Sequence, residues 1–152
     1  MKVLSLFAII VWLIGCGTDR PDPYTTRIDA KLKPEIEKWQ EDCLLHLTKA
    51  DCNTYGIESI SIRSKLNGKN VIGQCEYRYE GMYKVKRIYI SSEVPLNTYY
   101  SRALILHEML HCRFDFQAHT DNGIMADTMY MSNYAMMENW PRLLEEAYAL
   151  VK

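Results

Sequence analysis

The sequence of 152 residues lacks three features, and each absence excludes a class of protein or site. It has no excess of charge of either sign, since 18 Lys and Arg side chains are balanced by 19 Asp and Glu side chains, so nothing indicates nucleic-acid binding. It has no Cys-x-x-Cys spacing, which argues against a tetrathiolate zinc site. It is also too short for more than one modest domain with a single core.

The N-terminal residues are typical of a secretory signal. Lys2 gives a basic start, and the apolar run that follows is too short and wrongly flanked for a membrane span. The alternative is an anchor helix that is not cleaved. The stretch from Leu13 to Cys16 resembles the lipobox of bacterial lipoproteins. This resemblance implies cleavage before Cys16, which would receive the lipid.

We therefore expect three segments: a signal peptide at 1–15, a lipidated N-terminus and flexible tether at 16–31, and one folded domain at 32–152. Residues 17–31 contain two prolines and little apolar material, which suits a tether. The lipobox resemblance places the protein in the cell envelope, on the periplasmic side or at the outer membrane if the host has two membranes. We expect a monomer.

Four cysteines remain after Cys16, an even set in a small chain bound for an oxidising compartment. Three pairings of Cys43, Cys52, Cys75 and Cys112 are possible. We favour Cys43 with Cys52 and Cys75 with Cys112, while free thiols are the alternative.

The hydrophobic patterns predict an α+β fold. A helical stripe runs through 33–51, where its apolar members are Ile36, Trp39, Cys43, Leu44 and Leu47. Alternating patterns at 56–64, 71–79 and 83–91, with a hairpin signal at Asn67-Gly68, predict a small three-stranded antiparallel meander. A closing helix is expected in 138–152, with Asn139 as its cap and Pro141 in its first turn.

A helix at about 98–115, capped by Asn97 or Thr98, contains the most informative stretch, ALILHEMLHCRF. It is apolar nearly all round, which predicts a central helix packed against the sheet. His107 and His111 lie four residues apart, on one face and one turn apart, where both can bind one ion. Glu108 points about 100° away and can reach a water on that ion instead. The alternative is two core histidines that are hydrogen-bonded to backbone.

This H-E-x-x-H arrangement resembles the zincins, and its sequel resembles the metzincins, in which a third histidine and a methionine turn follow the helix. His119 and then Met125 follow here in that order. The spacing departs from the metzincin pattern, because Phe114 replaces the glycine, Gln117 replaces the histidine, and His119 comes two residues late. The resemblance implies a zincin-like fold with Zn²⁺ held by His107, His111 and His119.

The third ligand has alternatives. A glutamate on a later helix could replace His119, as in gluzincins, and the candidates are Glu138, Glu145 and Glu146. Asp115 and Asp121 are weaker candidates. Tyr130 or Tyr134 could steady an oxyanion by the same resemblance.

The expected function is a zinc metallopeptidase anchored to the envelope. Glu108 would act as general base and acid on a peptide or protein substrate, including the peptide part of the cell wall. The alternative is a non-catalytic lipoprotein that binds or masks a surface partner and holds a structural zinc.

Overall fold

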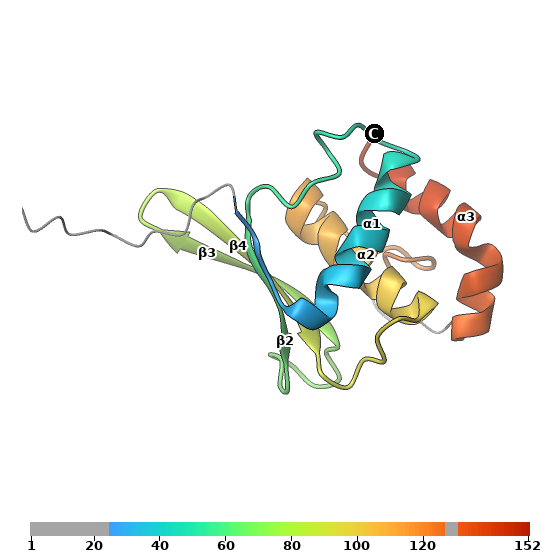
Figure 1. Ribbon diagram of the computed structural model, residues 1–152, viewed down its shortest axis with the longest axis horizontal. Helices are drawn as coiled ribbons and strands as arrows, with labels where there is room; N and C mark the ends of the chain where they lie inside the picture. Colours follow the sequence, from blue (N-terminus) through green and yellow to red (C-terminus); the bar gives the residue numbers. More distant parts are fainter. Residues whose placement is uncertain (1–24, 127–130) are drawn as a thin grey trace, which may run out of the picture.

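The computed structural model describes residues 25–126 and 131–152, and Figure 1 shows their arrangement. In chain order the elements are β1 (Arg27–Ile28), the 3₁₀ turn η1 (Ala30–Leu32), α1 (Lys33–Leu44), β2 (Ile57–Arg63), β3 (Gly73–Glu80), β4 (Tyr83–Ser91), α2 (Tyr99–Phe114) and α3 (Asn133–Ala149). The predicted mixture of helices and strands is confirmed.

The predicted antiparallel meander is wrong. The sheet has four strands in the order β1-β2-β4-β3, with β2 parallel to both β1 and β4 and only β3 antiparallel to β4. Parallel pairing places Ile60 beside Ile88 and Ile62 beside Ile90, so the apolar rows of β2 and β4 coincide on the helix-covered face. Burial of these isoleucine rows against each other therefore decided the strand pairing, against the hairpin signal at Asn67-Gly68.

Asn67-Gly68 does not form the expected hairpin. It lies in the nine-residue connection 64–72, which carries the chain from the end of β2 past β4 to the start of β3. The tight turn is instead at Gly81-Met82, where Gly81 has φ +66° and Glu80 pairs with Tyr83.

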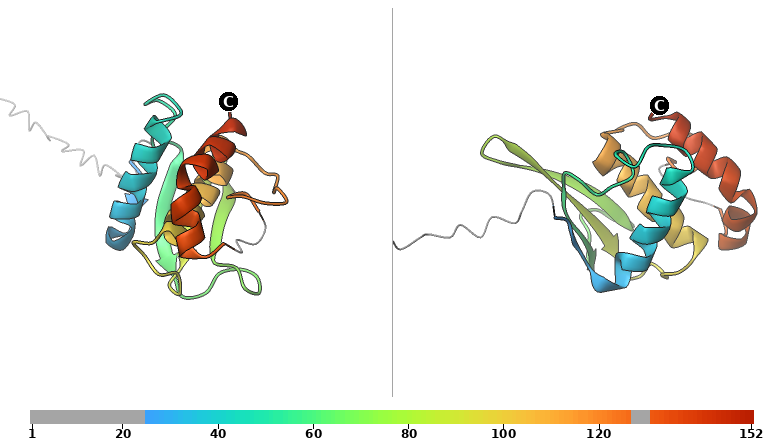
Figure 2. Two further views of the ribbon diagram at one scale, coloured as in Figure 1. Left: turned by 90° about the vertical axis from the view of Figure 1, so that its right-hand side faces the viewer. Right: turned by 45° about the horizontal axis from the view of Figure 1, so that its top comes forward.

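The helices cover one face of the sheet, and α2 lies at the centre (Figure 2). It contacts β3 and β4 on one side and α1 and α3 on the other. Thr98 caps it through a capping box with Ser101, and it ends at Asp115, whose φ is +55°. The predicted central position and bounds of this helix are confirmed.

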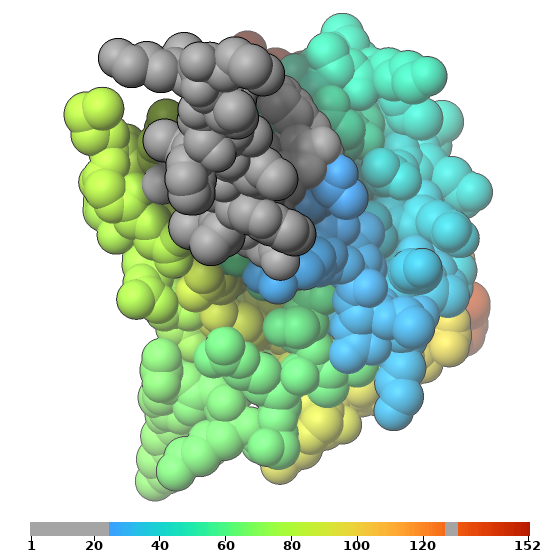
Figure 3. All heavy atoms as spheres, turned by 60° about the vertical axis from the view of Figure 1, so that its left-hand side comes forward, coloured from blue at the N-terminus to red at the C-terminus, as the bar shows by residue number. Residues whose placement is uncertain are grey.

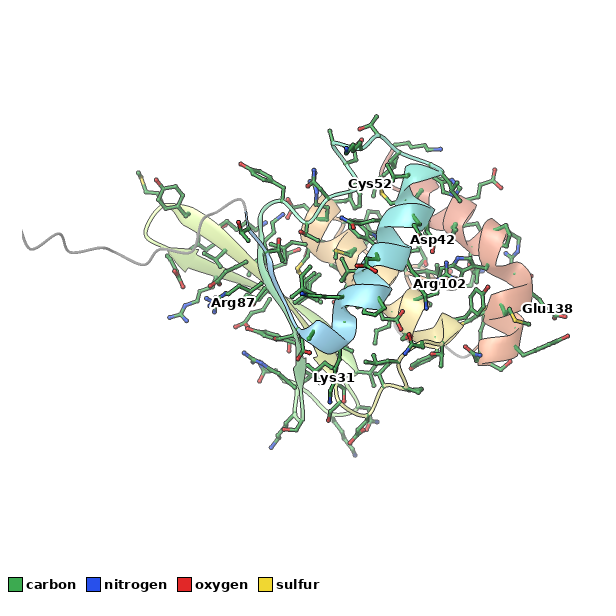
Figure 4. The ribbon with its side chains drawn as sticks, viewed as in Figure 1. Lys31, Asp42, Cys52, Arg87, Arg102 and Glu138 are labelled. Carbon is green, nitrogen blue, oxygen red and sulfur yellow. A yellow bond between two sulfur atoms is a disulfide. The ribbon has the colours of Figure 1, made fainter. Side chains whose placement is uncertain are left out.

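A buried ion pair joins the three helices. Arg102 on α2 donates to both carboxylate oxygens of Asp42 on α1, at 2.8 and 2.7 Å, and the indole N–H of Trp140 on α3 donates to the same carboxylate (Figure 4). The pair is only partly exposed, with 20 % of the Arg102 side chain and 12 % of the Asp42 side chain accessible, so solvent screens it less than an ion pair on the open surface. The pair therefore fixes the position of α2 relative to its neighbours.

The outer helices differ from prediction in detail. In α1, Ile36, Trp39 and Cys43 are buried as expected, but Leu44 is 51 % exposed because the helix ends there. In α3, Asn139 is not the cap; Ser132 is, and Pro141 lies inside the helix. The Asn139 amide donates to the carbonyl of Ala135 instead. The helix therefore begins seven residues, or about two turns, before the start that Asn139 and Pro141 indicated.

The favoured disulfide pairing is confirmed. Cys43 is bonded to Cys52, and Cys75 is bonded to Cys112. The first bond closes the loop after α1, and the second ties β3 directly to α2. The metal-binding helix predicted from sequence is thus covalently attached to the edge of the sheet.

The predicted tether is ordered at its end, because β1 and η1 lie within 27–32 and Leu32 is fully buried. The folded domain therefore begins by Arg27 rather than at residue 32. The signal peptide and Cys16 lie outside the described residues. Within 25–126 and 131–152, no helix is both long and apolar enough to cross a membrane.

Candidate metal centre

Three histidine side chains meet at one point. His107 and His111 come from successive turns of α2, and His119 comes from the loop after it. The Nε2 atom of His111 lies 3.1 Å from the Nε2 atoms of both His107 and His119. The structure thus brings together the three predicted ligands, and this group could hold a metal ion.

Backbone carbonyls set the orientation of both helix histidines. The Nδ1 of His107 is 2.7 Å from the carbonyl oxygen of Ile124, and the Nδ1 of His111 is 2.6 Å from that of Phe116. A carbonyl oxygen can only accept, so Nδ1 carries the proton and the Nε2 of a neutral ring does not. Hydrogen bonds of this kind, from the ring nitrogen that faces away from the metal, fix the tautomer and orientation of metal-binding histidines.

The spacing of the nitrogens fits a small divalent cation. A tetrahedral site with metal–nitrogen bonds of about 2.0–2.1 Å separates its nitrogens by roughly 3.3 Å. The contacts of 3.1 Å are close to that value. When both rings are neutral with the proton on Nδ1, neither Nε2 atom of His107 and His111 has a proton to donate, and a cation bound between them would account for their approach. The donor set and the spacing therefore fit a metal ion.

Burial of His111 favours the neutral form of its ring. It lowers the pKa of the His111 ring, while the hydrogen bond to Phe116 raises it and His119 lowers it. The neutral form, which is the form that binds a metal, therefore persists to a lower pH than for an exposed histidine.

The loop 115–126 returns His119 to the helix. The left-handed conformation of Asp115 reverses the chain, and the N–H of Phe116 donates to the carbonyl of Leu110. Further along, the N–H of Thr120 donates to the carbonyl of Met125, which closes a turn around Gly123. His119 stands directly before this closed turn, so its position depends on the loop backbone.

Met125 occupies the place expected for a methionine turn in sequence, and it is buried at 1 % exposure. Its neighbour Ile124 supplies the carbonyl that accepts from His107. The turn therefore orients the His107 ring through a backbone carbonyl, while the Met125 side chain packs in the core.

Glu108 is buried beside the strand β3. Its side chain is 3 % exposed, and burial raises its pKa to about 8, although the backbone N–H of Cys75 donates to it and lowers the pKa. Gly73 makes room for it, because a Cβ at this position would lie 2.5 Å from Oε1 of Glu108 and 2.8 Å from Cδ1 of Leu104. The carboxyl group is therefore held between the helix and the first residues of β3.

A cleft of about 860 Å³ contains the site. Its lining includes the three histidines, Glu108, Gly73 and Cys75. Since β3 is an edge strand, one side of its backbone has no neighbouring strand among the described residues. The histidines, the buried acid and a free strand edge therefore share one open space.

Sequence reasoning missed Tyr77 as a residue of this site. Its hydroxyl donates to the carbonyl of His111 and accepts from the Gln117 amide, both at 2.6 Å. The signal was available, because Tyr77 lies two residues after Cys75 and so faces the same side of the strand. With Cys75 bonded to Cys112, that side is the one next to His111.

The alternative ligands lie elsewhere. Glu138 points outward from α3 (Figure 4), and Glu145 and Glu146 are exposed on the same helix. Asp115 binds Lys84 and Lys86, and Asp121 is exposed. None of these five belongs to the histidine group.

The remaining candidates are also separate from the group. Tyr134 is exposed on α3, and Tyr130 lies outside the described residues. His46 stacks on Tyr148 with ring centroids 5.1 Å apart, as a boundary histidine would.

Comparison with known proteins gives no relative from which a role could be transferred. No protein-family model, no characterised protein and no solved structure matches this chain.

Proposed function

We propose that the chain is a zinc-dependent metallopeptidase of the zincin class, anchored to the cell envelope as a lipoprotein through Cys16. The observation that carries this proposal is the convergence of His107, His111 and His119 in a cleft that also contains the buried carboxyl group of Glu108. Lipid anchoring rests on the sequence of residues 1–16 alone.

Zinc is the metal that this donor set favours. Three neutral imidazoles are a frequent catalytic zinc set, in which a fourth position stays open. A structural zinc site has four protein ligands as a rule, and only three converge among the described residues. This difference favours a catalytic role over the alternative of a binding protein with a structural zinc.

The chemistry divides between the ion and Glu108. A zinc ion in such a site polarises a carbonyl group and lowers the pKa of water. Glu108 supplies the proton transfer: its carboxyl group takes a proton from the attacking water and returns it to the leaving amine. Burial raises the pKa of this carboxyl group, which makes it a stronger base than an exposed glutamate and suits proton transfer near neutral pH.

The open edge of β3 supports a peptide as the substrate. An extended peptide can pair with the backbone of an edge strand, and Gly73 and Cys75 line the cleft along that edge. Val71, Ile72 and Leu104 give the cleft apolar surface for a side chain. Proteins, peptides and the peptide part of the cell wall all fit this description.

The test is the substitution Glu108→Gln, with Glu145→Gln on α3 as the matched control. Both proteins should bind one equivalent of zinc, measured by elemental analysis, and both should unfold at similar denaturant concentrations. On a library of quenched fluorescent peptides, Glu108→Gln should lose hydrolysis by about 10²- to 10⁴-fold, the contribution of a general base. Equal hydrolysis by both variants would contradict catalysis at this site.

A further inference from the structure

The tip of the β3–β4 hairpin exposes large side chains that the proposed function does not use. Tyr79, Met82 and Tyr83 are 71, 94 and 67 % exposed, and they lie within five consecutive residues. The hairpin extends beyond the helices in Figure 1, and Figure 3 shows its yellow-green atoms at one edge of the molecule. Exposed apolar groups concentrated in this way mark an interaction surface.

The three side chains point in different directions. Tyr79 pairs with Lys84, and Glu80 pairs with Tyr83. Residues directly opposite each other share a face of the sheet, so Tyr79 and Tyr83 lie on opposite faces of the hairpin. Met82 sits between them in the turn. A flat protein partner would cover only one of these faces, whereas a fluid lipid layer could surround the whole tip.

The incoming chain reaches the domain at the same end of the sheet. Arg27 of β1 is in register with Ser59, and Ser59 is in register with Arg87 of β4. Since β1 and β4 run in the same direction, the N-terminal end of β1 faces the end of the sheet where β4 begins at Tyr83. The residues that precede the described part include the apolar run 3–14 and Cys16.

Basic side chains outnumber acidic ones just behind the tip. Lys84 and Lys86 share the carboxylate of Asp115, and Arg78 and Arg87 share that of Glu80. The tip therefore has aromatic and thioether side chains, with an excess of positive charge beside it that suits an anionic lipid surface. Tyrosine at the level of the headgroups is typical of side chains at a membrane interface.

We propose that the tip of the β3–β4 hairpin, residues 79–83, inserts into the interfacial layer of a lipid bilayer. Together with the N-terminal segment, it gives the domain a second point of attachment at the same end of the sheet. The insertion needs neither the metal nor hydrolysis, so it stands or falls apart from the peptidase proposal.

Two attachments would fix the orientation of the cleft. From Met82 back to Cys75, which lines the cleft, is seven residues, so at about 3.3 Å per residue this part of the cleft lies within roughly 23 Å of the tip. The open edge of β3 would then face substrates close to the membrane surface rather than those deep in solution.

The experiment places a tryptophan at the tip. Full-length protein with Met82→Trp is reconstituted into vesicles of phosphatidylcholine and phosphatidylglycerol, with and without bromine on the lipid tails, which quenches tryptophan on contact. Met137→Trp is the matched control, since Met137 is also exposed but lies on α3, on the other side of the molecule. The signal of the parent protein, with its own tryptophans, is subtracted from both.

We expect a blue shift and loss of emission for Met82→Trp in brominated vesicles and neither for Met137→Trp. Adding Tyr79→Ser and Tyr83→Ser to the Met82→Trp protein should reduce this quenching while the protein stays with the vesicles. Emission from Met82→Trp that is no more quenched than that of the control would overturn the proposal. So would a blue shift that depends on protein concentration in detergent without lipid, which would indicate a second copy as the occupant.

Discussion

The two ends of strand β3 have different surroundings. At its start, Gly73, Cys75 and Tyr77 contact α2 through close packing, a disulfide and a hydrogen bond. At its end, Tyr79 and the turn residues that follow it are exposed, and the hairpin extends beyond the helices (Figure 1). One continuous strand therefore supports a candidate metal centre at one end and a proposed membrane contact at the other.

The difference shows that residue type does not decide the role of a position in this strand. Tyr77 and Tyr79 are the same residue on the same face, two positions apart. Only Tyr77 lies over the helix, so only its hydroxyl is bound to protein groups in this way. The distance of each position from α2 determines what its side chain does.

Removal of the proposed metal should strongly destabilise the region around the histidines, at the start of β3, and leave the hairpin tip unchanged. Zinc at a thousandfold excess over its dissociation constant would stabilise the fold by about 4 kcal/mol. We expect a chelator to lower the melting temperature accordingly and to increase amide hydrogen exchange in the loop 116–126. Exchange at 79–83 should stay unchanged. Increased exchange at both ends would show that the two regions are not independent.

The disulfides should differ in their contribution to stability. In the chain-entropy relation, a loop closed over 37 residues, as in Cys75–Cys112, is worth about 4 kcal/mol, whereas a loop over 9 residues, as in Cys43–Cys52, is worth about 3 kcal/mol. Replacing Cys75 and Cys112 by serine should therefore lower the free energy of unfolding more, measured by urea denaturation. It should also weaken hydrolysis, because β3 would be released from α2. Equal loss of activity in both double variants would argue against this positioning role.

The glycines at the two ends of the hairpin give a sharper comparison. Alanine at Gly73 would press on Glu108 and Leu104, at a cost of about 1–3 kcal/mol, and should reduce hydrolysis. Alanine at Gly81 meets nothing within 4 Å but must adopt φ +66°, at a cost of about 1 kcal/mol. Hydrolysis by Gly81→Ala should equal that of the parent. Denaturation curves and peptide assays on both variants test the contrast.

Substitutions of Tyr77 and Tyr79 should have the smallest effect on the free energy of unfolding. Tyr77→Phe loses the hydrogen bonds to the carbonyl of His111 and the amide of Gln117, which should cost about 1 kcal/mol of stability. Tyr79→Phe should leave the free energy of unfolding unchanged, because its side chain is exposed. A matched pair of denaturation curves measures both, and equal stability of the two variants would mean that the Tyr77 hydroxyl contributes nothing.

Much of the candidate site could be predicted because its signals are local. The i, i+4 spacing of His107 and His111 holds on any helix, and Thr98, one of the two predicted cap residues, is where that helix begins. The favoured disulfide pairing was confirmed as well. His119 was predicted by resemblance, and the loop hydrogen bonds that bring it back could not be read from residue types.

The wrong predictions relied on local sequence signals. In each case, contacts between residues far apart in the sequence decided the structure. Asn67-Gly68 is a strong hairpin signal, yet burial of the isoleucine rows placed β2 parallel to β4. Pro141 and Asn139 indicated a helix start, but the packing of Met136 and Trp140 in the core extended α3 backward.

The sequence by itself determined the helix that bears His107, Glu108 and His111, and it determined which residues could serve as ligands. These follow from backbone periodicity and from side-chain chemistry, which depend on neighbours along the chain. Only the tertiary structure decided the strand order, the place of Glu108 against Gly73, and the separation of Tyr77 from Tyr79. Those features depend on which surfaces pack together, and packing free energy is summed over residues that are far apart in sequence.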